Sequence, residues 1–242
     1  GAPRAALDDY AAATRARARA AEVAGRLHAW TVPVRAADGT VALDRDELLG
    51  YAPTAAELAA LPPAFAQLGA DGQDALALAA APSLTAITHD HTRASSPPLA
   101  DGAALLLLGD APTAARLGLT PLARVVAATA VADDPIAMLT AGQLALERVV
   151  ARAGVTIADL AVVEFAEAFS ALCLRLARAH DLGPDRLNPD GGTLALGHAF
   201  GATGAILAGN VVAHLARTRG RLGAAAVSGA AGVGSAVLFE AA

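Results

Sequence analysis

The sequence predicts an α/β protein in which a sheet of order βαβαβαββ follows an irregular, partly helical lobe. From residue 83 onward, short apolar runs alternate with segments of helical periodicity, a pattern typical of a sheet covered by helices on both faces. Residues 35–82 are instead rich in Pro, Ala, Asp and Gly. We therefore predict a loop domain over residues 1–82 and a layered α/β domain over residues 83–242.

The composition limits the classes of protein to which the chain can belong. Hydrophobic residues make up 55% of the 242 residues and charged residues 17%, which supports a packed core and excludes disorder. The net charge of −5 argues against a nucleic-acid partner. All basic residues are arginine, which excludes a Schiff-base or phosphate-binding lysine. The single cysteine, Cys173, excludes a disulfide framework and favours a reducing, cytoplasmic location.

The lobe begins with one long predicted helix. Residues 7–28 carry helical periodicity, with Asp8 and Asp9 in the first turn, where the helix dipole favours acidic residues. We expect the arginines that follow to form a solvated face, with contact to an anionic phosphate as the alternative: Arg15, Arg17 and Arg19. A short strand is predicted at 31–34 and a short helix at 55–61.

The layered domain is predicted to contain five strands, each read from a short apolar run. They are 103–108, 122–131, 161–165, 224–228 and 235–240. Helices are predicted between them, the second ended by Gly154: 114–117, 141–153 and 168–180.

Residues 191–216 form a stretch of 26 residues without Asp, Glu, Lys or Arg. A helix that is apolar on all sides is buried on all sides, so we predict a central helix with protein above and below it. The chain supplies only one sheet, which leaves one face of this helix for something else to cover. A transmembrane helix is the alternative, against which the six glycines and the polar Asn210, His198 and His214 argue.

Two features of this region are candidates for chemistry. We expect His198 at the helix start, in the turn 197–199, where a histidine near free backbone amides can act as a donor or a base. A structural histidine is the alternative. The turn VSGAAGVGSA, residues 227–236, is followed by a strand rather than a helix, so we expect it to expose backbone amides suited to an oxyanion.

Two further groups carry titratable side chains. Glu164 and Glu167 lie where a strand feeds a helix, and Glu167 alternatively pairs with the helix dipole. His89 and His91 flank Asp90 and are expected to face one side of an extended segment. A metal site needs a third ligand, which the sequence does not indicate, so no metal is expected.

Taken together, these stretches resemble the C-terminal half of a thiolase. NPDGGTLALGHAFGATGAIL is similar to the family's Asn-x-x-Gly-Gly and Gly-His-Pro block, with Ala199 where proline is usual. VEFAEAFSA and VSGAAGVGSAVLFE resemble its Glu-Ala-Phe and terminal Cys-Gly blocks. ADGAALLLLGD, 100–110, resembles the strand that opens the second repeat, and LPPAF, 61–65, the loop region before it. The resemblance implies half of a five-layer αβαβα sandwich, with the neutral run as its central helix.

The resemblance also implies an activity and its residues. It implies acyl transfer between coenzyme A and a 3-ketoacyl-CoA or acetyl-CoA, with coenzyme A as substrate or product and no other cofactor. His198 would activate the acyl-carrying thiol, Ser228 stands where the family has a second catalytic cysteine, and Gly229 and Ala230 would lend oxyanion amides. The other implied residues line the acyl and pantetheine tunnel or contact coenzyme A: Phe65, Met138 and Phe169, and Ser95 or Ser96.

The chain departs from the family pattern in three places, and two of them, Ser228 and Ala166, favour an alternative, a degenerate acyl-CoA-binding or partner subunit with little turnover. The family's nucleophilic cysteine lies in an N-terminal repeat that we expect to be absent here, and Cys173 on the helix after Phe169 does not replace it. Ser228 replaces a cysteine, and a serine hydroxyl is essentially never ionised unaided. Ala166 replaces an Asn or His that positions a water.

The resemblance also sets the expected partners. Because the chain begins at Gly1, we expect it to be trimmed or partial, with no signal segment. The expected partners are acyl-CoA, an N-terminal thiolase half or a separate partner chain, and further copies in a homo-oligomer of fatty acid metabolism. No nucleic acid and no membrane are expected.

Overall fold

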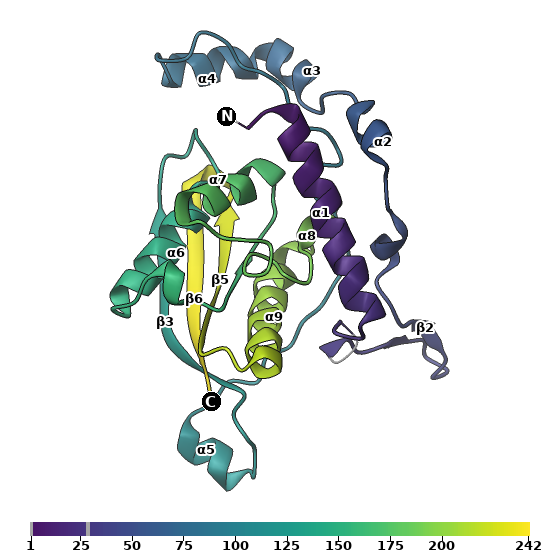
Figure 1. Ribbon diagram of the computed structural model, residues 1–242, viewed down its shortest axis with the longest axis vertical. Helices are drawn as coiled ribbons and strands as arrows, with labels where there is room; N and C mark the ends of the chain where they lie inside the picture. The colour runs from purple at the N-terminus through teal and green to yellow at the C-terminus, as the bar shows by residue number, and fades with distance from the viewer. Residues whose placement is uncertain (1, 28–29) are drawn as a thin grey trace. The chain divides into compact units, whose positions relative to one another are not determined.

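The computed structural model describes residues 2–27 and 30–242 (Figure 1). The chain divides into two compact units built from discontinuous segments. The first comprises residues 1–98, 167–175 and 190–198, and the second comprises residues 99–166, 176–189 and 199–242. The boundary that the sequence predicts between residues 82 and 83 stays a prediction.

The second unit contains a four-stranded sheet of order β3-β6-β5-β4. Its strands are β3 (Ala123–Ala132), β4 (Val162–Phe165), β5 (Leu222–Gly229) and β6 (Val233–Ala241). The short β4 pairs parallel with β5, and the other two pairs are antiparallel. Each strand lies within two residues of its predicted position, because each apolar run is bounded by turn residues. The α/β fold class is therefore confirmed.

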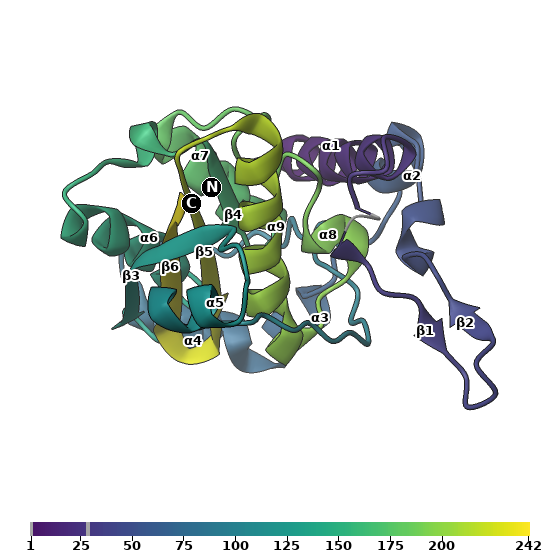
Figure 2. The same ribbon diagram turned by 90° about the horizontal axis from the view of Figure 1, so that it is seen from below.

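Two helices cover opposite faces of this sheet, α6 (Ala141–Arg152) and α9 (Thr203–Thr218) (Figure 2). Side chains alternate between the faces of a strand, and β5 shows this directly. Its Ser228 lies against Gly142 of α6. Gly223, an odd number of residues earlier in the same strand and so on the other face, lies against Val211 of α9. The run of Gly and Ala in β5 leaves room for both helices to approach closely.

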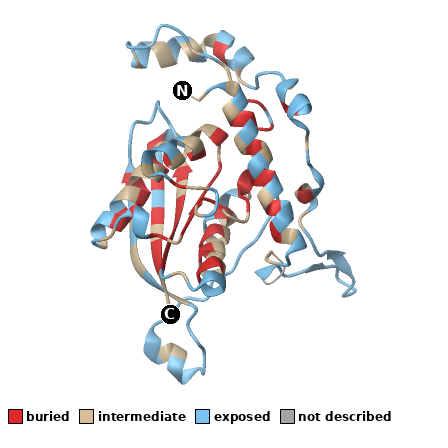
Figure 3. Ribbon diagram, viewed as in Figure 1, coloured by how far each residue is buried: buried red, intermediate tan, exposed pale blue. Residues whose placement is uncertain are grey.

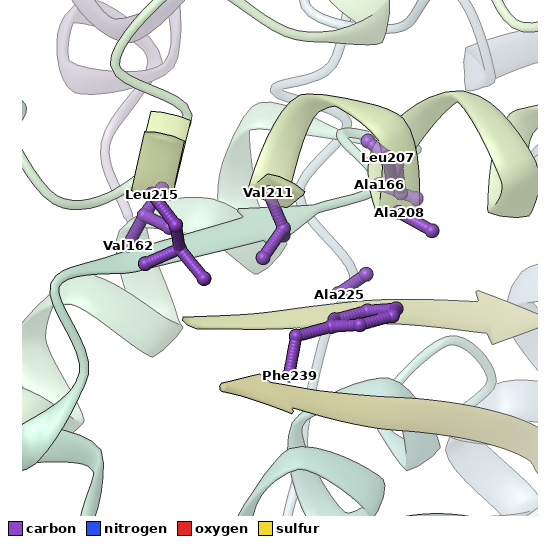
Figure 4. Close-up of a cluster of buried hydrophobic side chains, with 8 residues drawn as sticks. All are labelled: Val162, Ala166, Leu207, Ala208, Val211, Leu215, Ala225 and Phe239. Atoms are coloured by element: carbon purple, nitrogen blue, oxygen red, sulfur yellow. The ribbon is translucent and has the colours of Figure 1, made fainter. Parts of the chain in front are cut away.

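The contact between α9 and the sheet forms the main apolar cluster of this unit (Figure 4). Leu207, Val211 and Leu215 are at most 1% exposed and pack onto the strands. Their spacing of four residues places them on one helix face. The other members of the cluster are Val162, Ala166, Ala208, Ala225 and Phe239. In Figure 3 the strands beneath α9 are correspondingly marked as buried.

The neutral run forms two helices rather than one. The short α8 (Thr193–Leu196) ends at Gly197, a 3-10 turn covers Phe200–Ala202, and α9 follows. Within this chain one face of α9 stays uncovered, as the sequence predicts: Gly204 and Ala216 are exposed, and Ile206 and Val212 are half-buried. The physical reason is that the single sheet covers one face of α9.

The strand predicted at residues 103–108 does not form. These residues have no regular secondary structure, and Leu105, Leu107 and Leu108 are 95%, 83% and 73% exposed. An apolar run of this length forms a strand only where a neighbouring strand completes its hydrogen bonds, and the described part of the chain pairs no strand with it. The short helix after it is present as α5 (Ala111–Arg116), capped by the side chain of Asp110.

The first unit is built around α1 (Arg4–Val23), which starts three residues before its predicted start and ends earlier. Asp8 therefore lies in the second turn, where it accepts a hydrogen bond from Arg4 at 2.7 Å. The end predicted at His28 lies outside the described residues. The strand predicted at 31–34 is displaced to β1 (Val34–Arg35), which pairs with β2 (Val41–Leu43) in an exposed hairpin (Figure 3).

The rest of residues 35–82 is more helical than the sequence predicts. The predicted helix at 55–61 forms as α2 (Ala55–Ala59), held by a capping box between Thr54 and Glu57. Two further helices, α3 (Ala66–Leu68) and α4 (Asp74–Ala80), follow it. Their short length and alanine-rich sequence leave little periodicity to detect.

The solvated arginine face predicted on α1 is wrong for Arg15. Its side chain is buried and donates to the carbonyl oxygens of Ala11 at 2.8 Å and Ala94 at 3.0 Å, with the guanidinium over the Tyr51 ring. Positions 7, 11, 15 and 18 share one helix face, so Arg15 lies on the face that packs inward. Arg17 is half-buried, and only Arg19 is exposed as predicted.

No helix in the described ranges is long and apolar enough to cross a membrane.

Candidate active site

His198 lies in the first unit, directly after the end of α8. Gly197 ends that helix with a φ of 86°, a conformation that favours glycine, and its N–H donates to the Thr193 oxygen at 2.8 Å. The backbone N–H of His198 donates to the Pro98 oxygen at 2.9 Å. The sequence predicts His198 at the start of a long helix, and this position is wrong. His198 instead follows the end of the short α8.

The imidazole of His198 is half-buried, and burial lowers its pKa below the ordinary histidine value. A histidine whose pKa is lowered is neutral at pH 7, and a neutral imidazole can accept a proton. The side chain thus has the protonation state that a general base requires.

Ser228 lies in the second unit near the end of β5, where it is 8% exposed. Its Oγ accepts the N–H of Gly142 at 2.9 Å, in the first turn of α6. A side chain at Gly142 would overlap Ser228, so the close approach of helix and strand requires glycine there. An atom held at this position receives both a backbone donor and the positive end of the α6 dipole.

The glycine turn after β5 carries the predicted oxyanion residues. Gly229 is half-buried, and Ala230 is exposed at the start of a 3-10 turn over Ala230–Gly232. Ala231 has a φ of 58°, which is unusual for a residue with a side chain. The Asp133 N–H donates to the Gly232 oxygen at 2.7 Å, so the segment that leads to Met138 lies beside this turn.

Met138 belongs to a strained connection between β3 and α6. It has a φ of 45° and its neighbour Leu139 a φ of 57°. Met138 is 44% exposed. The second unit thus places the glycine turn that follows Ser228 beside the segment that leads to Met138.

An aromatic cluster in the first unit brings together Phe65, Phe169 and Ser95. The Phe65 and Phe169 rings meet edge to face with centroids 5.8 Å apart. The His91 ring lies 4.8 Å from Phe169, and its Nδ1 is 3.1 Å from the Oγ of Ser95. Burial lowers the pKa of His91, against the opposing effect of the Asp90 charge.

The two serines predicted to contact coenzyme A differ in their surroundings. Ser95 is fully buried, and its Oγ accepts the Thr92 N–H at 2.9 Å. Ser96 is half-buried, with its Oγ 3.4 Å from the Thr92 oxygen. Of the two, Ser96 is the more accessible to a ligand.

His91 lies beside Phe169 and Ser95, although the sequence analysis considers it only as a possible metal ligand together with His89. The THDHT pattern suggested two histidines facing one side, but His89 pairs with Asp74 at 2.9 Å and His91 turns toward Ser95. Within residues 2–27 and 30–242, no group of three His, Cys, Asp or Glu side chains could hold a metal ion.

Glu167 is fully buried in the first unit and bound by several donors from distant parts of the chain. The Tyr10 O–H donates to its Oε1 at 2.8 Å, and the Leu194 N–H donates to its Oε2 at 3.0 Å. Thr14 also donates to the carboxylate. Sequence reasoning missed Tyr10 and Thr14, because nothing local links α1 to a motif more than 150 residues later.

The remaining predicted positions are buried. Cys173 is completely buried, and burial raises the pKa of its thiol well above the ordinary value, as expected for a packing residue. Glu164 is 1% exposed, with the Asn210 amide 3.4 Å from its Oε2. Ala166 is 2% exposed and lies in the apolar cluster beneath α9 (Figure 4).

Comparison with known proteins gives consistent matches. Residues 119–241 match the family model described as "Thiolase, C-terminal domain". Acetyl-CoA acetyltransferase B, mitochondrial, of Xenopus laevis is 42% identical over 149 residues, 62% of this chain and 35% of the relative. The acetyl-CoA acetyltransferase of Paracoccus denitrificans is 30% identical over 239 residues, and the beta-ketothiolase BktB of Cupriavidus necator is 32% identical over 243 residues. Each of these two alignments covers 98% of this chain and 56% of the relative.

The fold also matches a solved structure. The crystal structure of human mitochondrial 3-ketoacyl-CoA thiolase superposes with a TM-score of 0.82 at 24% identity, over 99% of this chain and 56% of that one. The chain thus spans about half the length, or less, of the relatives that it matches.

Proposed function

The chain belongs to the thiolase family, and from that premise we propose that it contributes the C-terminal half of an acyl-CoA acyltransferase. The proposed reaction moves an acyl group between coenzyme A and a 3-ketoacyl-CoA or acetyl-CoA, with no further cofactor. The observation that carries the proposal is the His198 turn, in which burial keeps the imidazole neutral and backbone hydrogen bonds fix its place.

In this proposal His198 acts as the base toward the thiol that carries the acyl group. A base that accepts the thiol proton leaves a thiolate, which is the nucleophile of acyl transfer. Gly229 and Ala230 would supply backbone donors to a developing oxyanion. Phe65, Phe169 and Met138 would contact the acyl and pantetheine parts of the substrate, and Ser95 or Ser96 its coenzyme A part.

The N-terminal half of the fold is the proposed partner, on the same polypeptide or on another. The outer face of α9 and the leucines of residues 104–108 are apolar surfaces that a second layered half would bury. Assembly into a homo-oligomer and a cytoplasmic role in fatty acid metabolism are further parts of the proposal. Some of the relatives are mitochondrial proteins.

Ala166 favours a second candidate function, an acyl-CoA-binding or partner subunit with little turnover. The methyl group of Ala166 packs among Leu207 and Ala208, so this position offers no polar group to hold a water. Losing one such oxyanion contact typically costs about 100- to 1000-fold in rate. Ser228 favours the same candidate, because a hydroxyl does not readily give up its proton.

A thiolysis assay with acetoacetyl-CoA separates the two candidates. The chain is assayed together with the polypeptide that supplies the N-terminal half, as wild type, Ser228→Cys and His198→Asn. We expect Ser228→Cys to raise the rate at least about 100-fold, because a thiol on β5 that faces the first turn of α6 ionises far more readily than a hydroxyl. His198→Asn should abolish turnover in both backgrounds.

If wild type and Ser228→Cys are both inactive, the acyltransferase proposal is overturned. A thermal-shift titration with coenzyme A then tests the second candidate. A stabilised chain supports the binding subunit, and no shift at millimolar coenzyme A counts against it.

A further inference from the structure

The buried carboxylate of Glu167 gathers hydrogen-bond donors from two separate parts of the first unit. The O–H groups of Tyr10 and Thr14 on α1 donate to Oε1 at 2.8 and 2.9 Å, and the Leu194 N–H of α8 donates to Oε2 at 3.0 Å. The two carboxylate oxygens together accept hydrogen bonds from all three donors. The buried guanidinium of Arg15 also interacts with the carboxylate charge, which offsets part of the cost of burying it.

The turn before α8 lies directly on this carboxylate. The Gly192 N–H donates to the Thr14 hydroxyl at 3.1 Å, and a side chain at Gly192 would overlap the Glu167 carboxyl group. Gly191 has a φ of 83°, and a side chain there would collide with Ala18 of α1. Two adjacent glycines thus let the turn contact both α1 and Glu167.

Only the short, hydrogen-bonded α8 and Gly197 separate this turn from His198. The N–H of Leu196 donates to the Gly192 oxygen at 3.0 Å, and the N–H of Gly197 donates to the Thr193 oxygen at 2.8 Å. The next residue, His198, is tied through its own N–H to Pro98. Because α8 is a single short turn of helix, a displacement of residues 192–194 would also displace the backbone of His198 and its imidazole.

We propose that Glu167 is a positioning residue, whose carboxylate fixes the turn at residues 192–194 and thereby the location of the His198 imidazole. The reactive role of His198 rests on the proposed function, whereas the anchoring is carried by the contacts themselves. The proposal assigns a task to a glutamate that touches no reacting group.

The ring resonances of His198 in carbon–proton NMR spectra of the full chain test this proposal. They are assigned by their loss in His198→Asn. Glu167→Met keeps the length of the side chain but removes both acceptors, and we expect it to shift or broaden the His198 resonances. Glu167→Gln keeps one oxygen for the Leu194 N–H, while its amide can donate to the Tyr10 or Thr14 oxygen, so it should restore them to near their wild-type positions.

A destabilised control separates positioning from general loss of stability. Val149→Ala removes buried methyl groups from α6 in the other unit and should lower the melting temperature without moving the His198 resonances. If Glu167→Met folds and leaves these resonances unchanged, the proposal is wrong. If Glu167→Met does not fold, Thr14→Val decides by the same readout, because it removes the bridge to Gly192.

No substrate enters this measurement, so the proposal and the proposed function can fail separately. If wild type and Ser228→Cys are both inactive while the His198 resonances still depend on Glu167, the acyltransferase function alone is overturned. Active protein whose His198 resonances are indifferent to Glu167→Met overturns the positioning role alone.

Discussion

At the scale of single residues, the candidate site depends on a few backbone conformations and buried contacts. Gly142 and Gly192 have no room for a side chain, since one lies against Ser228 and the other against Glu167. Ala231 is the reverse case, a residue with a side chain in the left-handed region. Adding a methyl group at such a glycine should therefore lower the stability, whereas removing the methyl group of Ala231 should not.

Ala231→Gly should leave the stability unchanged or raise the free energy of unfolding by up to about 1.6 kcal/mol. Relief of the left-handed strain of about 1–2 kcal/mol is offset by the greater freedom of glycine in the unfolded chain, about 0.4–1 kcal/mol. Urea denaturation measures the difference.

Gly232→Ala is the matched control for this change. Gly232 has a φ of 76°, and a side chain there would collide with the Asp133 oxygen, so this variant should lose at least about 2 kcal/mol. Equal stabilities of the two variants would contradict the strain argument.

His91 predicts a pH dependence of stability. Because burial lowers its pKa in the folded state, the unfolded chain binds a proton at higher pH than the folded chain does. Stability is therefore lost as the pH falls below the unfolded value of about 6.5 toward the folded value. The urea concentration at the unfolding midpoint of wild type should decrease when the pH is lowered from 8 to 5.5. The decrease should be smaller in His91→Gln. An equal fall in both proteins would show that His91 is not responsible.

At the scale of elements, α9 links sequence pattern to packing most directly. Its apolar residues do not all serve the same purpose: Leu207, Val211 and Leu215 pack on the sheet, whereas Gly204 and Ala216 face outward. Hydrophobicity alone does not separate the two faces, since exposed positions such as Gly204 and Ala216 are apolar while the polar Thr203 and His214 are buried.

Leu215→Ala should destabilise the chain by about 2–5 kcal/mol, because it leaves a cavity between α9 and β4. Ala216→Ser, on the exposed face one position later, should change stability by less than about 0.5 kcal/mol. Both values follow from thermal or urea unfolding. A costly Ala216→Ser would mean that this face is already covered in the isolated chain.

At the scale of the whole molecule, the chain presents apolar surface that its own elements do not bury. Leu105 and Leu107 are 95% and 83% exposed, and a contiguous exposed apolar patch favours association with another chain. The relatives are longer than the part that this chain matches, which is at most 56% of their length. Together these facts predict that the isolated chain associates.

Leu105→Asp with Leu107→Asp should reduce concentration-dependent association of the isolated chain in sedimentation velocity experiments. Exposed side chains contribute little to folding, so the free energy of unfolding should change by less than about 0.5 kcal/mol. The paired change Ala13→Asp with Ala20→Asp, at two exposed positions of α1, adds the same two negative charges and controls for charge. Unchanged association in the leucine variant would assign the contact to another surface.

The sequence by itself determined the α/β class, the positions of four sheet strands and the residues of the glycine and histidine turns. Each of these is encoded locally, by an apolar run with its bounding residues or by a contiguous motif. Only the tertiary structure decided that Arg15 is buried, that residues 103–108 lack a strand partner, and that Tyr10 and Thr14 bind Glu167. These outcomes depend on contacts between residues far apart in the chain, or on a partner strand, and a local pattern contains neither.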